Sequence, residues 1–241
     1  FSVGGFDCVL GNPPWDKINL KDEEYFASIK QEIADAPTKS KRTVLIEALK
    51  TEDPDAWHAY MKVQHFHDAL SMYLRNGPRF PKTGVSRINL YSVFAEHGCF
   101  LLAPTGRLGY VLASGIATDD NNKDLFWYLV DKSRLAFVFD FENREGIFKD
   151  VDSRYKFALL AVTGNKLESS QADFAFYLTN MEQLEETERH FTLTREELYL
   201  LNPNTKTCPT FRNRAEAELT KYIYKRVPAW ELQEKTDEWP G

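Results

Sequence analysis

Phe6-Asp7-Cys8-Val9-Leu10-Gly11-Asn12-Pro13-Pro14-Trp15 is the stretch that decides how this chain folds. Its first five residues form a short, largely apolar run of β-prone residues, and Gly11-Asn12-Pro13-Pro14 breaks that run abruptly. Proline fixes its own backbone angle and restricts the residue before it. We therefore expect a strand that ends in a rigid, proline-fixed loop.

A helical segment is predicted directly after this loop. From Asp22 to about Asn76 the sequence is polar, with apolar residues at helical spacing and breaks near Pro37 and Pro54. A second helix is predicted from Leu90 to Leu102, ended by Pro104-Thr105-Gly106. The first segment is interpreted as a helical insertion between the loop and the rest of the fold.

The remainder of the chain alternates between strand and helix patterns. Strands are predicted at 107–112, 135–141, 155–163 and 173–178, and helices at 122–132, from about 195, and at 214–225. Alternation of this kind is typical of an α/β sheet with helices packed on it. The predicted fold class is therefore α/β.

Composition bounds the class of protein. The chain has 241 residues, of which 43% are hydrophobic and 27% charged, enough for a substantial core. No apolar run approaches the roughly 18 residues that cross a bilayer, so a cytoplasmic location is expected. Cys8, Cys99 and Cys208 show neither disulfide nor metal-ligand spacing and are expected to be reduced. No metal site is predicted.

The formal net charge of −6 does not suggest a dedicated nucleic-acid binder, but the charge is unevenly distributed. Seven basic and four acidic residues lie between Arg195 and Arg226. This segment could form a phosphate-facing surface or a solvated helix face. The sequence does not distinguish the two.

The loop at Asn12 has the groups needed to polarise an aromatic amino group. The exocyclic nitrogen of adenine is a poor nucleophile because its lone pair is delocalised into the ring. The side-chain oxygen of Asn12 and the carbonyl of Pro13 could accept both amino hydrogens, and Pro14 stiffens the loop. Trp15 could replace the stacking that a base loses when it leaves a duplex. The alternative is an ordinary Pro-Pro turn beside a half-buried tryptophan.

A family resemblance extends beyond the loop. Phe6 to Trp15 resembles the fourth motif of the adenine-specific amino-methyltransferases of DNA. The chain is also similar to large bacterial restriction-modification and phage-defence enzymes, related to type IIG systems and the BREX methyltransferases. The segments that carry this resemblance are Asn89-Leu90-Tyr91 with Phe94, Gly109 to Leu112 with Ser114-Gly115-Ile116, Asp140 to Arg144, Gly146-Ile147-Phe148, Tyr155-Lys156-Phe157, Leu201 to Thr205, Cys208-Pro209 and Phe211-Arg212.

The resemblance implies roles for individual residues. Asn12 and the Pro13 carbonyl would hold the target amino group, and Trp15 and Phe148 would stack on the two sides of a flipped adenine. Phe94, with Asn12, would contact the cofactor S-adenosylmethionine. The partner would be double-stranded DNA. Core packing is the alternative for both phenylalanines.

The resemblance also implies a division of the chain. Residues 1–21 would be the catalytic strand and loop, 22–87 the helical insertion, 88–168 the remaining methyltransferase domain, and 169–241 an extension toward target recognition. Together they would form the C-terminal half of a Rossmann-like methyltransferase sheet.

Two expectations follow for the amino-terminal side of that sheet. The glycine-rich turn and acidic residue that hold the cofactor in this family would precede Phe1, so we expect an incomplete cofactor site and no methylation by these residues alone. We also expect an open strand edge at Phe6 to Leu10, which could support self-association.

Two other functions are compatible with the same loop. It could polarise another planar amino group, such as that of a protein glutamine or an RNA guanine. The chain could also be a noncatalytic module that binds DNA or another partner. The segments downstream of the loop favour DNA methylation over both.

Overall fold

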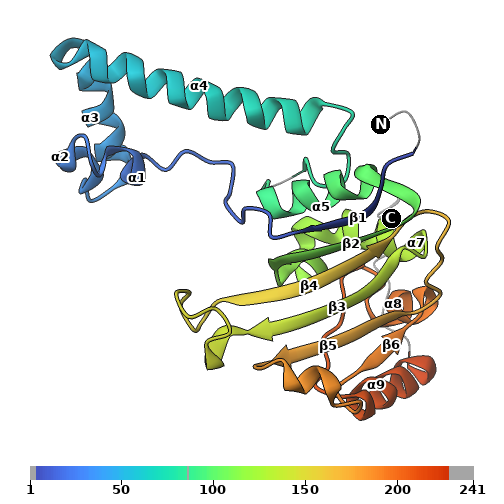
Figure 1. Ribbon diagram of the computed structural model, residues 1–241. Helices are drawn as coiled ribbons and strands as arrows, with labels where there is room; N and C mark the ends of the chain where they lie inside the picture. The colour runs from blue at the N-terminus through green and yellow to red at the C-terminus, as the bar shows by residue number, and fades with distance from the viewer. Residues whose placement is uncertain (1–3, 86, 228–241) are drawn as a thin grey trace, which may run out of the picture.

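The computed structural model describes residues 4–85 and 87–227. Its centre is a six-stranded mixed sheet in the order β1-β2-β4-β3-β5-β6 (Figure 1). The strands are β1 (Phe6–Gly11), β2 (Leu102–Ala113), β3 (Leu135–Glu142), β4 (Lys156–Thr163), β5 (Ala172–Leu178) and β6 (Phe191–Leu193). The chain therefore has the α/β fold that the alternating pattern predicts.

Strand direction changes in the middle of the sheet. β1 is parallel to β2, and β3 is parallel to β5, whereas β4 runs antiparallel between β2 and β3. The carboxyl ends of β1, β2, β3 and β5 consequently lie at the same end of the sheet. Side chains from loops far apart in the sequence can gather there.

The helices that follow the Asn12 loop form an arm. They are α1 (Asp22–Phe26), α2 (Gln31–Ala34), α3 (Lys39–Glu52) and α4 (Pro54–Asn76), and Figure 1 shows the arm extending away from the sheet. The Asp53 side chain caps α4 by accepting a hydrogen bond from the Ala56 N–H at 3.2 Å. Pro54 occupies the first turn of α4, where its missing N–H costs no hydrogen bond.

The arm has a core of its own and starts and ends at neighbouring points. Its buried cluster, separate from that of the sheet, consists of Phe26, Ile33, Ile46, Leu49 and Tyr60. At the base of the arm, the Leu90 N–H donates to the Asp16 carbonyl at 2.9 Å, and Lys17 pairs with Asn89. The predicted insertion thus leaves the sheet and returns at the same place.

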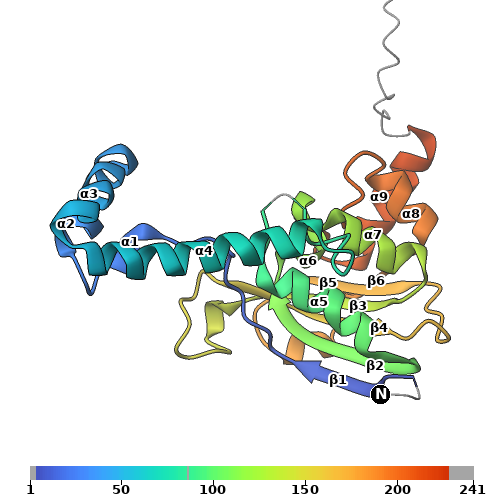
Figure 2. The same ribbon diagram turned by 90° about the horizontal axis from the view of Figure 1, so that it is seen from above.

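The main core lies between the sheet and the later helices. These are α5 (Leu90–Leu101), α6 (Gly115–Thr118), α7 (Lys123–Asp131), α8 (Arg195–Leu201) and α9 (Arg214–Arg226). Figure 2 shows α5 and α7 on the same side of the sheet. Leu108, Leu112, Leu125, Leu129 and Phe174 are among the buried side chains of this core. No helix within residues 4–85 and 87–227 has the length and apolarity to cross a membrane.

Local details differ from the predictions. Pro104-Thr105-Gly106 does not separate helix from strand, because β2 already begins at Leu102. Phe6 pairs with Leu102 and Cys8 with Arg107, so residues 103–106 bulge out within the strand.

The four-residue helix α6 and the three-residue strand β6 were not predicted, since elements this short show no clear periodicity. β5 and β6, from the segment assigned to an extension, belong to the same sheet.

Candidate functional site

The Asn12 loop lies at the carboxyl end of β1, at the end of the sheet where the parallel strands finish. Pro13 is buried, Asn12 and Pro14 are exposed, and Trp15 is half-buried. The indole N–H of Trp15 donates a hydrogen bond to the Asn12 side-chain oxygen at 3.1 Å. This bond fixes the orientation of the amide and leaves the second lone pair of its oxygen available.

A pocket of about 550 Å³ opens beside this loop. Asn12, Pro13, Pro14 and Trp15 form one part of its wall. The rest comes from the β3–β4 connection and the start of β4, with Asn143, Phe148, Asp150, Val151, Asp152, Tyr155 and Phe157. The structure therefore brings Phe148 together with all four loop residues that the sequence singles out. Their chemical roles stay predictions.

Aromatic rings make up much of the pocket wall. Phe148 is 36% exposed and meets Phe157 edge to face, with ring centroids 4.9 Å apart. Phe157 in turn stacks on the fully buried Phe141, and Trp15 packs against the same cluster. Phe148 thus rests on a buried core and presents its remaining surface to the pocket.

Sequence reasoning missed several residues of this wall. Asn143, Tyr155 and Phe157 lie in segments that carry the family resemblance, but the resemblance implies no role for them. Asn143 is 1% exposed, and its side chain hydrogen-bonds to the loop that follows it. An asparagine two residues beyond the predicted strand 135–141, in a segment that turns back toward the next strand, was the available signal.

Two buried carboxyl groups lie on β3, just before Asn143. Burial raises the pKa of Asp140 to about 6, although its interactions with the Ser114 hydroxyl and the Tyr177 backbone act in the opposite direction. The pKa of Glu142 is lowered, mainly by its hydrogen bond with Lys156 and also by Arg144. The surroundings thus shift the pKa values of the two acids in opposite directions.

The pocket wall also carries an exposed acid with a fixed partner. The side chain and backbone of Arg154 donate hydrogen bonds to Asp152, and these bonds lower the pKa of its carboxyl group. Asp152 therefore keeps its negative charge at the pH of a cell.

The two residues assigned to the cofactor, Asn12 and Phe94, lie in different surroundings. Asn12 lines the pocket, whereas Phe94 lies on α5, is 39% exposed and is not part of the pocket wall. This pocket therefore does not bring the two residues together. The cofactor roles of both residues stay predictions.

The basic segment from Arg195 to Arg226 is partly internal. Lys221 is 6% exposed and pairs with Glu218 at 2.5 Å and Glu197 at 3.3 Å. Arg195 pairs with Asp131 at 2.8 Å. Ion pairs within the fold therefore neutralise part of the local positive charge. Arg212 is among the basic side chains that stay exposed.

Comparisons with known proteins give a likeness to solved structures alone. No protein-family model matches the chain, and no curated protein matches it. Three of the similar structures come from restriction-modification systems. One is the methyltransferase subunit of a type I system from Streptococcus thermophilus, with 15% identity and a TM-score of 0.43 over 58% of this chain and 35% of that one.

The other two cover more of this chain. The type IIG restriction endonuclease BpuSI shows 16% identity and a TM-score of 0.45 over 83% of this chain and 20% of its own. A structure of a type I restriction-modification system shows 13% identity and a TM-score of 0.44 over 93% of this chain and 42% of that one. This chain thus spans between a fifth and about two fifths of these proteins. Identities this low do not identify an activity, so function has to be inferred from the pocket.

Proposed function

We propose that this chain is the base-binding part of an enzyme that methylates the exocyclic amino group of adenine in DNA. The proposal includes a restriction-modification or phage-defence setting. The observation that carries it is the pocket that a proline-fixed asparagine loop shares with Phe148. The pocket supplies hydrogen-bond acceptors and aromatic surface together, which a flipped adenine requires.

The acceptors act on the amino group. The Asn12 side-chain oxygen already accepts one hydrogen bond from Trp15, and its other lone pair can accept an amino hydrogen. The Pro13 carbonyl is the second acceptor that we assign. Two such bonds draw the nitrogen lone pair out of the ring and toward the methyl donor. S-adenosylmethionine, when bound, supplies an electrophilic methyl group.

The rings act on the base as a whole. A base that leaves the duplex loses its stacking, and each base–aromatic stack contributes about 1–3 kcal/mol. Trp15 and Phe148 line the pocket from separate segments of the chain, and we assign them to the two faces of the purine. Trp15 therefore has two functions in this proposal, because its ring stacks while its N–H orients Asn12.

Methylome sequencing of a host that expresses the complete gene encoding this chain tests the proposal. We expect methylated adenine in a defined DNA motif. The variant Asn12→Ala should keep DNA binding and lose methylation about 100-fold or more, the usual cost of removing one preorganised polar group from a reacting centre. Trp15→Phe should lose less, because it keeps a stacking ring and loses only the N–H.

The outcomes separate the alternatives. Unmodified DNA together with a methylated glutamine or RNA guanine would indicate the other amino-group substrates. DNA binding without any methylated product would indicate a noncatalytic module. Full methylation by Asn12→Ala would contradict the role of the loop, and equal loss of binding and methylation would indicate damage to the fold.

A further inference from the structure

We infer that Asn143 is the positioning residue that sets Phe148 in place before a base enters the pocket. The inference rests on the proposed function, because it concerns the same pocket. Phe148 belongs to the connection between β3 and β4, which runs from Asn143 to Tyr155. This connection supplies most of the pocket wall outside the Asn12 loop.

The Asn143 side chain makes three hydrogen bonds to this connection. Its two N–H groups donate to the Phe148 carbonyl at 2.9 Å and the Val151 carbonyl at 2.8 Å. Its oxygen accepts from the Phe148 N–H at 2.9 Å. Because a carbonyl can only accept and an N–H can only donate, these partners also fix which end of the amide is which.

The same residue closes the connection at its far end. The Asn143 backbone N–H donates to the Tyr155 carbonyl at 2.9 Å, and its carbonyl accepts from the Gly146 N–H at 3.1 Å. Gly146 has a φ of 71°, a left-handed conformation that glycine adopts easily in a tight turn. Phe148, Val151 and Tyr155 are thus all bonded to one buried residue.

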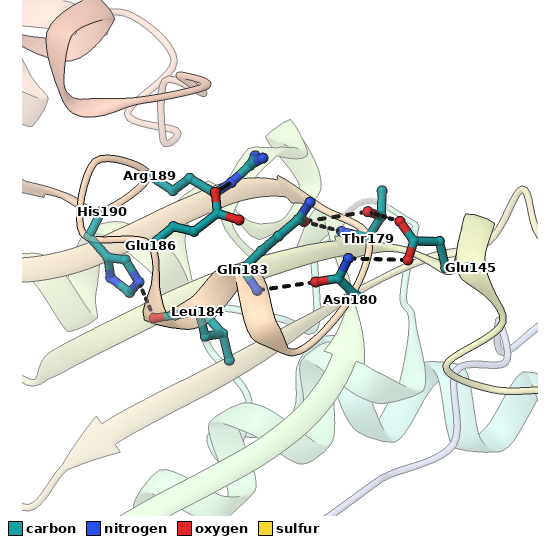
Figure 3. Close-up of polar contacts among 8 residues, drawn as sticks. All are labelled: Glu145, Thr179, Asn180, Gln183, Leu184, Glu186, Arg189 and His190. Atoms are coloured by element: carbon teal, nitrogen blue, oxygen red, sulfur yellow. Dashed lines mark hydrogen bonds and ion pairs between the residues drawn. The ribbon is translucent and has the colours of Figure 1, made fainter.

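A second attachment holds the start of the connection. The Glu145 carboxylate accepts hydrogen bonds from the Thr179 hydroxyl at 2.5 Å and the Asn180 side-chain amide at 3.1 Å, as Figure 3 shows. Thr179 and Asn180 directly follow β5. The connection is therefore fastened both to itself and to the segment after the neighbouring strand.

Burial alone would not immobilise the side chains that the connection contributes to the pocket wall. Phe148 is 36% exposed, Val151 41% and Tyr155 57%, so each keeps a large apolar surface in contact with water. Exposed loop side chains lose mobility when a ligand binds, and that loss weakens binding. A buried amide with three hydrogen bonds removes much of this cost beforehand, which is why we assign positioning of Phe148 to Asn143.

The test measures binding of 2′-deoxyadenosine to the whole chain by NMR, through the Trp15 indole N–H and the Phe148 backbone N–H. Asn143→Asp keeps the accepting oxygen but turns a carboxylate toward two carbonyl oxygens. We expect about 10-fold weaker binding at about pH 8. Hydrogen exchange should be faster at Val151, whose N–H donates to the Phe148 carbonyl that the carboxylate repels.

Acid should reverse the defect. Lowering the pH to about 5.5 should protonate the buried carboxyl of Asn143→Asp and restore binding substantially, since the acid can again donate one bond. The unaltered protein is measured at both pH values, because burial raises the pKa of Asp140 to about 6 and Asp140 lies on β3, three residues before Asn143. Recovery is judged relative to it.

Asn122→Asp is the matched control. Asn122 is also 1% exposed and donates to the Tyr91 hydroxyl at 3.1 Å and the Gly115 carbonyl at 2.7 Å, away from the pocket. It should lose stability without losing deoxyadenosine binding. A purely structural role for Asn143 predicts instead that the two variants lose binding in proportion to their stability, with no recovery of Asn143→Asp at low pH.

The remaining outcomes are also decisive. Unchanged binding by Asn143→Asp would overturn the inference. If the unaltered chain binds no deoxyadenosine, the proposed function loses its support. The positioning role of Asn143 is then tested by hydrogen exchange alone. Slow exchange at Val151 that becomes fast in Asn143→Asp supports the positioning role, and equal exchange in both proteins overturns it.

Discussion

At the scale of single residues, Asp140 is a buried acid whose charged form destabilises the folded state. It is 5% exposed, and one of its carboxylate oxygens has no hydrogen-bond partner among the described residues. Burial raises its pKa to about 6. Because the folded state then binds the proton more tightly than the unfolded state, stability falls as the pH rises from about 4 to about 6.

This shift predicts that Asp140→Asn stabilises the protein at neutral pH. The raised pKa corresponds to about 3 kcal/mol of unfolding free energy that is lost above about pH 6. The amide carries no charge and keeps one accepting oxygen. Urea unfolding at about pH 5 and about pH 8 should show a smaller pH dependence for Asp140→Asn than for the unaltered protein.

Glu142→Gln provides a control of opposite sign. The pKa of Glu142 is lowered by Lys156 and Arg144, so its contribution to stability is present above the pKa of the unfolded chain and is lost in acid. This variant should be less stable near neutral pH than the unaltered protein. If Asp140→Asn is destabilised there as well, the site holds the charged form of Asp140 and the argument from burial is wrong.

The sequence predicts site residues where a local motif carries the chemistry. Asn12 to Trp15 are contiguous, and a proline-fixed amide beside a tryptophan can be interpreted without knowledge of the fold. The positions of Asn143 and Asp140 depend on how β3 pairs with its neighbours, which no local pattern shows. Phe94 illustrates the opposite limit, because its predicted role comes from the resemblance alone and it does not line the pocket beside the Asn12 loop.

At the scale of elements, a bulge in β5 brings an aromatic ring close to basic side chains. Phe139 pairs with Ala175 and Phe141 with Leu178, so β5 carries an extra residue there. Tyr177 in the bulge has a φ of 61°, which is unfavourable for an aromatic residue. Its ring centroid lies 5.7 Å from the Lys156 ammonium and 5.9 Å from the Arg212 guanidinium.

This arrangement predicts that Arg212 contacts DNA phosphate. Arg212 is exposed and lies beside Tyr177, near the carboxyl end of β5. Arg212→Gln should weaken binding to duplex DNA of any sequence and lower the slope of log affinity against log salt by about 1. Fluorescence anisotropy over a range of salt concentrations measures both quantities.

Lys62→Gln is the control for overall charge. Lys62 is also exposed, but it lies on α4 in the arm. Its replacement changes the net charge equally and should leave the salt slope unchanged. Equal effects of the two variants would show that DNA affinity depends on the total charge of the protein. They would contradict a direct contact between Arg212 and phosphate.

Long elements were easier to predict than short or irregular ones. The α3–α4 segment and the strands of the central sheet repeat their apolar pattern often enough to show a period. β6 has three residues, and the bulge in β2 depends on which residues of β1 it faces. Pairing of this kind is a property of two strands together, so one segment of sequence cannot indicate it.

At the scale of the whole molecule, β1 occupies the edge of the sheet. Within residues 4–85 and 87–227 it pairs with β2 and with no other strand. Leu10 is 78% exposed on this edge. A strand edge with an apolar side chain favours pairing with a further strand, and a charged residue there opposes it. The edge position that the resemblance implied for β1 is therefore present in these residues, while self-association stays a prediction.

Leu10→Lys should reduce self-association of the chain. Sedimentation velocity at increasing protein concentration should show a concentration-dependent shift for the unaltered chain and a smaller one for the variant. Leu219→Lys is the matched control, since Leu219 is 60% exposed but lies on α9, where the backbone hydrogen bonds are made within the helix. If both lysines reduce association equally, exposed apolar surface in general is responsible. If the unaltered chain stays monomeric throughout, the β1 edge is not a pairing surface, and water satisfies its backbone groups.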